Sequence, residues 1–303
     1  MTNLVVSVPS PSLTELIDPL PEGVEVIEWD LTSPAPRESI DMVVFPPFAP
    51  PHLLEATAGI ETQLLQMQSI GYDALIGKVP AGKVVANGGS VHETATAELT
   101  LAILLAAVRE LPQVVRNQDL SQWRTFSVRG LADSRVLIVG SGGVGRAIAE
   151  RLIPFEVELT RVATRERDDD LGHIHGTEKL PELLPESDVV IVIVPLTPDT
   201  DGMVNDEFLT AMPDGAVLVN VARGKVADTD ALLRHADRLK IVADVTDPEP
   251  LPADHPLWQK AALITPHIAG ATNAQWPRLG ALLRRQIEHL VAGEEPENIV
   301  LRG

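Results

Sequence analysis

Short apolar runs alternate with stretches of helical pattern along the chain. A first series of runs covers residues 4–8, 24–29, 41–45, 63–68 and 83–86. A second series begins at residue 136 and continues at 158–164, 188–195, 216–222, 241–245 and 263–266. Short apolar strands that alternate with helices are typical of parallel sheets, so the pattern predicts two α/β units in succession.

Two long segments have the pattern of helices. Residues 94–111 (TATAELTLAILLAAVREL) contain neither Gly nor Pro and are apolar around most of the helix circumference, which indicates burial between domains or subunits. The final segment from Asn273 predicts a second long helix that ends near Gly293 and returns the chain to the first unit.

Composition and charge narrow the class of protein. The 303 residues are 45% hydrophobic, which suits two globular domains. A net charge of −19 argues against binding nucleic acid or an anionic membrane, so an anionic substrate needs a local cation or backbone N–H groups.

No cysteine is present, which excludes thiolate chemistry, and we predict no metal site. No apolar run reaches the roughly 18 residues of a membrane span, and the start MTNLVVSVPS lacks the features of a secretion signal, so a cytoplasmic protein is expected.

A glycine turn lies between the strand RVLIV and the helix that follows it. Its glycines Gly140, Gly142 and Gly145 have the spacing G-x-G-x-x-G, with Gly143 and Val144 between the last two. In a dinucleotide site such a turn brings the pyrophosphate onto the N-terminus of the helix. A glycine-rich loop without a ligand is the alternative, but the strand before it and the helix after it favour a nucleotide.

The strand after the glycine turn indicates which coenzyme is bound. An NAD site has an acidic residue about 20 residues beyond the turn, whereas this chain has Thr164 and Arg165, with Arg167 close by. The arginines favour the 2′-phosphate, so NADP(H) is the predicted coenzyme and NAD(H) remains possible. Solvated loop arginines are the alternative interpretation, and the acidic run Asp168–Asp170 could attract the same arginines.

Three polar residues follow later strands of the second unit. Arg223 comes directly after an apolar run, Glu249 lies between two prolines, and His267 follows a proline before IAG. Each alone could be a surface cation, a solvated acid or a structural histidine. Together they suit hydride transfer to a 2-keto acid, which needs a cation over the carboxylate and carbonyl, a proton donor, and a partner that keeps the donor charged.

The chain resembles the D-isomer-specific 2-hydroxyacid dehydrogenase family, and within it the glyoxylate/hydroxypyruvate reductase branch. The resemblance rests on VGSGGVGRAIAERL, PLTPDTDGMVN, NVARGKV, DVTDPEPLPADHPLW and TPHIAGAT, which occur in the family's order. It implies that Arg223 binds substrate, Glu249 supports the acid and His267 donates the proton. It also implies that backbone N–H groups of Ile70 and Gly71 hold the substrate carboxylate. The residues implied along the nicotinamide half of the coenzyme are Val194, Pro195, Val221, Ala222 and Asp244.

The resemblance also implies a fold. The expected architecture is α/β, with two Rossmann-like or flavodoxin-like parallel-sheet domains, the cofactor domain being inserted into a split substrate domain. We expect residues 1–91 to begin the substrate domain, 92–271 to form the NAD(P)-binding domain, and 272–303 to return as a C-terminal helix. Family members are commonly dimers, so a homodimer is expected, with a helix like residues 94–111 in the contact.

The predicted function is NADP-dependent interconversion of a small 2-keto acid, of the glyoxylate or hydroxypyruvate kind, and its D-2-hydroxy acid. The main alternative is a catalytically silent protein that senses NAD(P), as some corepressors with this fold do. A dehydrogenase of phosphite or formate is less favoured, because formate-type relatives carry an amide where this chain has Glu249.

Overall fold

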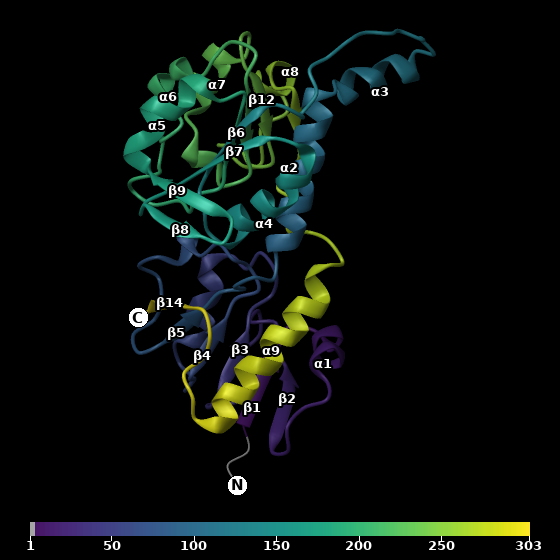
Figure 1. Cartoon of the computed structure of the whole chain (residues 1–303). Coiled ribbons are helices and arrows are strands. Elements are labelled where there is room, and N and C mark those ends of the chain that lie inside the picture. The colour runs from purple at the N-terminus through teal and green to yellow at the C-terminus, as the bar shows by residue number, and fades with distance from the viewer. Residues whose placement is uncertain (1–3) are drawn as a thin grey trace. The chain divides into compact units, whose positions relative to one another are not determined.

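The computed structural model describes residues 4–303, which fold as two compact units (Figure 1). One unit combines residues 4–92 with Asn273–Gly303, and the other consists of Glu93–Thr272. The second unit is therefore inserted in the chain between two parts of the first. This arrangement confirms the predicted α/β fold with one domain inserted into another, whereas the domain boundaries and the task of each domain stay predictions.

The first unit is built on one mixed sheet. Its strands run in the order β14-β5-β4-β3-β1-β2, and only β14 is antiparallel to its neighbour. The strands are β1 (Leu4–Val8), β2 (Val24–Glu28), β3 (Met42–Val44), β4 (Leu64–Gln66), β5 (Val84–Ala86) and β14 (Ile299–Arg302). The helices are α1 (Pro11–Ile17), α9 (Gln275–Ala292) and the short 3-10 turns Pro51–Thr57 and Asp73–Leu75. As expected, α9 ends at Gly293, whose φ of 69° is a conformation that glycine adopts without strain.

A buried amide pair joins α9 to this sheet. Gln286 on α9 is fully buried and donates to Gln66 Oε1 at 2.8 Å and to the Glu297 carbonyl at 2.9 Å. Its own oxygen accepts from the Glu297 N–H at 2.8 Å. Because every polar atom of this side chain has a partner, the amide fixes the position of α9 without the cost of an unsatisfied buried group.

The second unit contains a longer sheet in the order β13-β12-β11-β10-β6-β7-β9-β8. Its strands are β6 (Arg135–Val139), β7 (Glu158–Ala163), β8 (Arg167–Asp169), β9 (Gly172–Gly176), β10 (Val189–Val192), β11 (Val217–Asn220), β12 (Lys240–Ala243) and β13 (Leu263–Ile264). Its helices are α2 (Glu93–Val108), α3 (Leu111–Asp119), α4 (Gly143–Leu152), α5 (Leu180–Leu183), α6 (Asp206–Ala211), α7 (Thr229–His235) and α8 (Leu257–Lys260). Short 3-10 turns occupy Ile153–Phe155, Thr177–Lys179, Leu184–Glu186 and Gly224–Val226. The order around β6 is that of a dinucleotide-binding sheet: β7 and β9 lie on one side of β6, and β10 to β13 follow on its other side, with β6 and β10 parallel.

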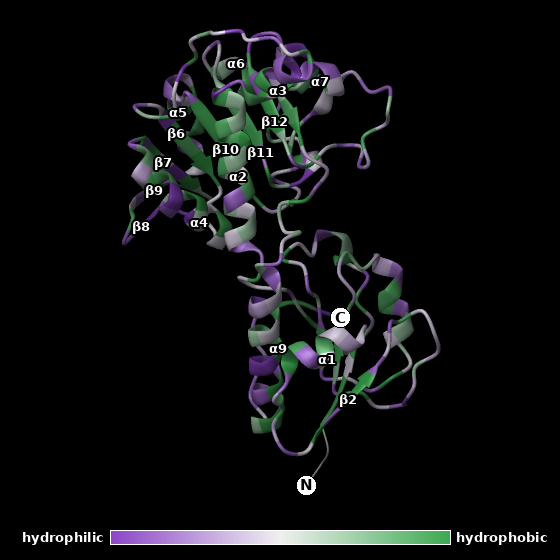
Figure 2. Ribbon diagram, turned by 90° about the vertical axis from the view of Figure 1, so that its right-hand side faces the viewer, coloured by the Kyte–Doolittle hydropathy of each residue, from purple (hydrophilic) through white to green (hydrophobic). Residues whose placement is uncertain are grey.

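Alternate residues of the central strands face two separate cores. Leu137 and Val139 of β6 pack with residues of α6 and α7, whereas Val136 and Ile138 pack with residues of α2 and α4. The helices accordingly cover both faces of the sheet, and Figure 2 shows the central strands as strongly hydrophobic segments. Burial on both faces explains why these strands read as continuous apolar runs.

The strands of this unit are in a common register at their carboxyl ends. Val139 of β6 pairs with Val192 of β10, and Val192 pairs with Asn220 of β11. The row continues through Ala243 of β12 to Ile264 of β13. The segment after each of these residues therefore leaves the sheet at the same edge.

The structure differs from the sequence prediction at polar segments. The predicted helix over 94–111 ends at Val108, and a separate helix α3 starts at Leu111 after Glu110, which has a φ of 54°. The strands β8, β9 and β14 are absent from the predicted series. In β8 and β9, polar residues and glycines obscure the apolar periodicity, whereas β14 is a run of only three apolar residues at the end of the chain. Between residues 4 and 303, no helix is both long and apolar enough to span a bilayer.

A buried arginine anchors the hairpin formed by β8 and β9. Arg161 of β7 has a side chain only 2% exposed and donates to both carboxylate oxygens of Asp169, at 2.8 and 2.6 Å. Its guanidinium also donates to the Gly172 carbonyl at 3.0 Å. Hydrogen bonds from Arg161 hold the pKa of Asp169 at about 2, below its ordinary 3.8. The hairpin is thereby fixed to the sheet.

Asp188 makes a comparable connection before β10. Its carboxylate accepts from the Arg135 N–H at 2.9 Å and from the Arg129 guanidinium at 3.0 Å. Burial alone would raise the pKa of Asp188, but the hydrogen bonds from Arg129 and Arg135 outweigh that effect and hold the pKa at about 2.

We therefore expect Asp188→Asn to destabilise the protein in a pH-dependent manner. A carboxyl with a pKa of 3.8 when unfolded and about 2 when folded stabilises the fold fully above the unfolded pKa, and this stabilisation disappears as pH falls through the folded pKa. The loss at pH 7 should be about 2 kcal/mol, from ~1.4 kcal/mol for each pKa unit. Urea unfolding at pH 7 and pH 2.5 measures it, and an equal loss at both pH values would contradict this interpretation.

Candidate functional site

The glycine turn between β6 and α4 is shaped by close backbone contacts. Gly140 has a φ of 114°, and a Cβ atom there would lie 2.2 Å from the Ile193 carbonyl oxygen. A Cβ atom on Gly145 would lie 1.9 Å from the Gly140 carbonyl oxygen, so α4 approaches β6 as closely as only glycine permits. By contrast, no atom lies within 4 Å of the position of a Cβ atom on Gly142. The backbone at Gly142 is therefore open to a ligand, which is what a bound pyrophosphate requires.

Two polar side chains beside this turn were not identified from the sequence. The buried Ser141 hydroxyl has no hydrogen-bond partner within residues 4–303. The carboxyl of Glu93, at the start of α2, lies where a side chain on Gly143 would project. Burial, followed by repulsion from Glu150, raises the pKa of Glu93. Glycine at position 143, the first residue of α4, thus leaves space for this acid, and Val144 follows it in the first turn of the helix.

The segment after β7 places the predicted coenzyme-selecting residues on the surface. Thr164 and Arg165 are exposed, and within residues 4–303 the Arg165 guanidinium has no hydrogen-bond partner. Arg167 instead donates to the Ser141 carbonyl at 2.8 Å and to the Arg165 carbonyl at 3.2 Å. Arg167 therefore ties the segment to the glycine turn, a role that its position in the sequence did not reveal.

The acidic run pairs with other groups than the sequence suggested. Asp169 binds Arg161, Asp170 binds Arg146 of α4 at 2.6 and 2.7 Å, and Asp168 binds His173 of β9 at 2.8 Å. The expectation that these carboxylates could attract the arginines after β7 is wrong for Arg165, because each carboxylate has another partner.

Arg223, Glu249 and His267 follow three neighbouring strands, β11, β12 and β13. His267 Nδ1 lies 2.5 Å from Glu249 Oε1, and the two side chains are 36% and 42% exposed. A carboxylate can only accept, so Nδ1 carries a proton and Nε2 is left to exchange one with a ligand. The structure brings this predicted pair into direct contact.

A buried aspartate shapes the turn that carries His267. Asp244, 2% exposed, accepts from the Thr265 hydroxyl at 2.6 Å and from the N–H groups of Ile268 and Ala269 at 3.0 Å each. The His267 N–H donates to the Asp244 carbonyl at 2.7 Å, and His267 has a φ of 51°. A histidine in this sparsely populated conformation needs such support from its surroundings. The family resemblance also implies that Asp244 lies along the coenzyme, which stays a prediction, and the structure adds that its carboxylate holds this turn.

The backbone around Arg223 is held by a side chain from β11. Asn220 donates to the Arg223 carbonyl at 3.1 Å and accepts from the Ala222 N–H at 3.1 Å. A Cβ atom on Gly224 would lie 1.9 Å from the Thr246 carbonyl oxygen, so the segments after β11 and β12 are in contact. Neither Asn220 nor Gly224 was selected from the sequence, although both belong to the motif NVARG.

The remaining predicted coenzyme contacts lie along the same edge of the sheet. Val221 and Ala222, which follow β11, are buried, while Val194 is partly buried and Pro195 exposed after β10. The Pro195 carbonyl accepts from the Thr200 hydroxyl at 2.6 Å. These four residues are therefore placed near the crevice where such sheets bind ligands.

Ile70 and Gly71 belong to the other unit, in the segment after β4. The Ile70 carbonyl accepts from Asn87 Nδ2 at 2.6 Å, and the Gly71 carbonyl accepts from the Ser69 hydroxyl at 3.0 Å. Within residues 4–303 neither N–H group donates a hydrogen bond. Both N–H groups are thus available to an anion, and their place in one site with Arg223 stays a prediction.

The chain matches known proteins over both units. The family model for the NAD binding domain of D-isomer specific 2-hydroxyacid dehydrogenases matches residues 101–269. The chain is 34% identical over 271 residues to human glyoxylate reductase/hydroxypyruvate reductase, with 82% of each chain covered. It is 32% identical over 254 residues to glyoxylate reductase of Thermofilum pendens, which covers 78% of this chain and 74% of the relative.

A solved structure is similar over nearly the full length. The D-isomer specific 2-hydroxyacid dehydrogenase from Xanthobacter autotrophicus Py2, in complex with NADPH and MES, has a TM-score of 0.83 and 25% identity, covering 99% of this chain and 98% of that one. With these similarities and the pair formed by His267 and Glu249, the resemblance seen in the sequence is confirmed, and the chain belongs to the D-isomer specific 2-hydroxyacid dehydrogenase family.

Proposed function

We propose that the protein is a cytoplasmic, NADPH-dependent reductase that converts glyoxylate, hydroxypyruvate or a similar small 2-keto acid to the D-2-hydroxy acid. The observation that carries the proposal is the 2.5 Å contact between His267 and Glu249 at the same sheet edge as Arg223 and the glycine turn. The names of the relatives, glyoxylate reductase and glyoxylate reductase/hydroxypyruvate reductase, support the substrate class.

Each polar residue has a distinct task in this proposal. When bound, NADPH supplies the hydride. The proton on His267 Nε2 goes to the carbonyl oxygen as negative charge develops there, and Glu249 stabilises the positive charge of the ring and fixes its orientation. Arg223 binds the carboxylate and the carbonyl oxygen with its planar guanidinium, and the N–H groups of Ile70 and Gly71 bind the carboxylate. Asp244 is a positioning residue, because its three hydrogen bonds hold the turn of His267.

The coenzyme is proposed to lie across the carboxyl edge of the sheet. Its pyrophosphate would contact the turn from Gly140 to Gly145, where the backbone at Gly142 is open. The nicotinamide half would contact Val194, Pro195, Val221, Ala222 and Asp244. Thr164 and Arg165 would bind the 2′-phosphate, and the exposed guanidinium of Arg165 supports this assignment.

We also infer a homodimer through the cofactor-binding unit. The helix α3 and the segment after it project from this unit in Figure 1 and expose Leu111, Val114, Val115, Leu120, Trp123 and Phe126. Trp123 is 96% exposed. A contiguous set of large apolar residues on a projecting arm is typical of a surface covered by another chain, and a second copy is the expected occupant.

Reduction of glyoxylate and hydroxypyruvate by NADPH tests the proposed activity. We expect His267→Ala to lower kcat by roughly 10²- to 10⁴-fold, which is the usual contribution of a positioned acid. Glu249→Gln should lower kcat less, because the amide still accepts from Nδ1 but does not stabilise the imidazolium. NADPH affinity should be unchanged in both variants. NADPH binding without turnover by the unmodified protein would favour a sensing protein instead.

Arg165→Ala tests the coenzyme assignment. Loss of a charge-assisted contact with the 2′-phosphate should lower kcat/KM for NADPH by roughly 10-fold or more and leave NADH nearly unchanged. Arg167→Ala is the matched comparison, because Arg167 holds the glycine turn and its loss should weaken both coenzymes. Equal losses with both coenzymes for Arg165→Ala would contradict its assignment to the 2′-phosphate.

Replacing Trp123 and Val115 by serine should shift the protein from dimer to monomer. Both side chains are more than half exposed on the projecting arm, so the variant should fold normally and lose only contacts between chains. Sedimentation equilibrium measures the mass, and Ile76→Ser, which alters an exposed apolar residue of the other unit, is the control. A monomeric unmodified protein would rule out the dimer.

A further inference from the structure

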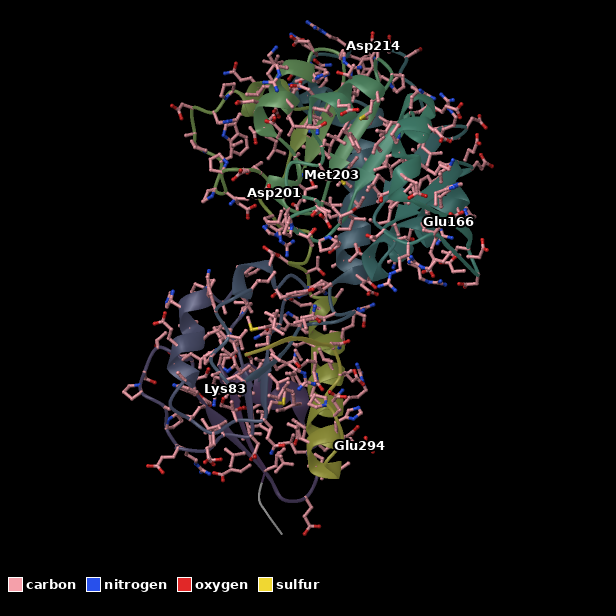
Figure 3. All side chains as sticks on the ribbon, turned by 90° about the vertical axis from the view of Figure 1, so that its left-hand side faces the viewer. Lys83, Glu166, Asp201, Met203, Asp214 and Glu294 are labelled. Atoms are coloured by element: carbon pink, nitrogen blue, oxygen red, sulfur yellow. The ribbon has the colours of Figure 1, made fainter. Side chains whose placement is uncertain are left out.

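His173 lies between two carboxylates beside the proposed 2′-phosphate site. Its Nδ1 is 2.8 Å from Asp168 Oδ1, and its Nε2 is 3.1 Å from Glu166 Oε1. Asp168 belongs to β8, His173 to β9, and Glu166 to the segment between β7 and β8. Figure 3 shows Glu166 at the surface of this unit. Glu166 is also the residue directly after Arg165, so its carboxylate is the acid nearest in sequence to the proposed phosphate ligand.

The two carboxylates around His173 favour a protonated ring. Ionised carboxylates only accept hydrogen bonds, so both ring nitrogens must carry a proton for both contacts to form. Protonation places one positive charge between two negative charges, and the two contacts hold Glu166 on the imidazolium. Hydrogen bonding to Asp168 is also the main cause that raises the pKa of His173 above its ordinary 6.5, with Glu166 adding to the effect.

A carboxylate at the position of Glu166 bears on the choice of coenzyme. A carboxylate close to the adenosine ribose accepts hydrogen bonds from the hydroxyls of NADH and repels the 2′-phosphate of NADPH. While His173 is charged, the imidazolium balances the negative charge of Glu166 and holds its carboxylate by the contact with Nε2. Once His173 is neutral, one of the two carboxylates loses its donor, and the free negative charge beside Arg165 opposes the phosphate.

We propose that His173 is a specificity-determining residue, which favours NADPH by holding Glu166 away from Arg165 and makes the preference for NADPH decline as pH rises. This inference rests on the proposed use of NADPH. Neither carboxylate was assigned a function above, and His173 belongs to none of the family motifs in the sequence.

The other charged groups near His173 set the direction and the size of the effect. Asp168 and Glu166 are 81% and 60% exposed, so water and salt screen their charges. The ring of His175 on the same strand packs edge-on against His173 with centroids 4.5 Å apart, and Arg165 and Arg167 flank Glu166 in the chain. The arginines keep their charge throughout, and His175 is the other histidine in contact with His173. The 2′-phosphate itself gains charge near pH 6, which strengthens NADPH binding with rising pH and so acts in the opposite direction.

The test measures dissociation constants of the full chain for NADPH and NADH between pH 6.5 and pH 9. In the unmodified protein, the preference for NADPH should fall by roughly two- to fivefold over this range, as expected for exposed charges. His173→Gln should show at pH 6.5 the lower preference that the unmodified protein has at pH 9. His173→Lys keeps a positive charge at every pH tested and should retain the higher preference up to pH 9.

Two further variants identify the groups involved. Glu166→Gln should abolish the pH dependence and keep the preference high, because the opposing carboxylate is gone. His175→Gln is the matched control and should retain the profile of the unmodified protein. Thermal unfolding verifies that all variants are folded.

The proposal would be overturned if the preference of His173→Gln for NADPH changed with pH as it does in the unmodified protein. It would also be overturned if His175→Gln abolished this pH dependence. These outcomes leave the NADPH-dependent activity intact. Failure of the unmodified protein to bind either coenzyme would overturn both the proposed function and this inference.

Discussion

The common register of five parallel strands is the constraint on which the site depends. Val139, Val192, Asn220, Ala243 and Ile264 form one row across the sheet, and the chain leaves the sheet directly after each of them. Parallel strands all present their carboxyl ends at one edge, so the glycine turn and the three polar residues arise at the same edge although they are far apart in sequence. The apolar strands, which are buried on both faces, therefore also bring the glycine turn and the three polar residues to one edge of the sheet.

Much of this arrangement could be predicted from the sequence because burial leaves a clear pattern. The strands β6, β10 and β11 are runs of Val, Ile and Leu, and the polar residues that follow such runs stand out. Residue types then suggested the pairing of His267 with Glu249, which the structure shows as a direct contact. Position relative to a strand end was thus the informative signal.

The rest could not be predicted because it depends on polar groups that meet only in the folded chain. Arg161 sits within a strand and would be taken for a solvated residue, yet it is fully buried against Asp169. The hairpin of β8 and β9 consists largely of charged residues, histidines and glycines, whose order shows no period of two. The carboxylate of Asp244 binds backbone N–H groups 24 and 25 residues further along, a relation that no local pattern reveals.

The contact of Gly224 with the Thr246 carbonyl joins the segments that carry Arg223 and Glu249. Since there is no space for even a methyl group, the two segments are packed directly against each other at this point. A substitution at position 224 would separate the substrate-binding cation from the partner of the acid without altering either residue. The geometry of the site is therefore sensitive to a position that has no side chain and takes no part in the chemistry.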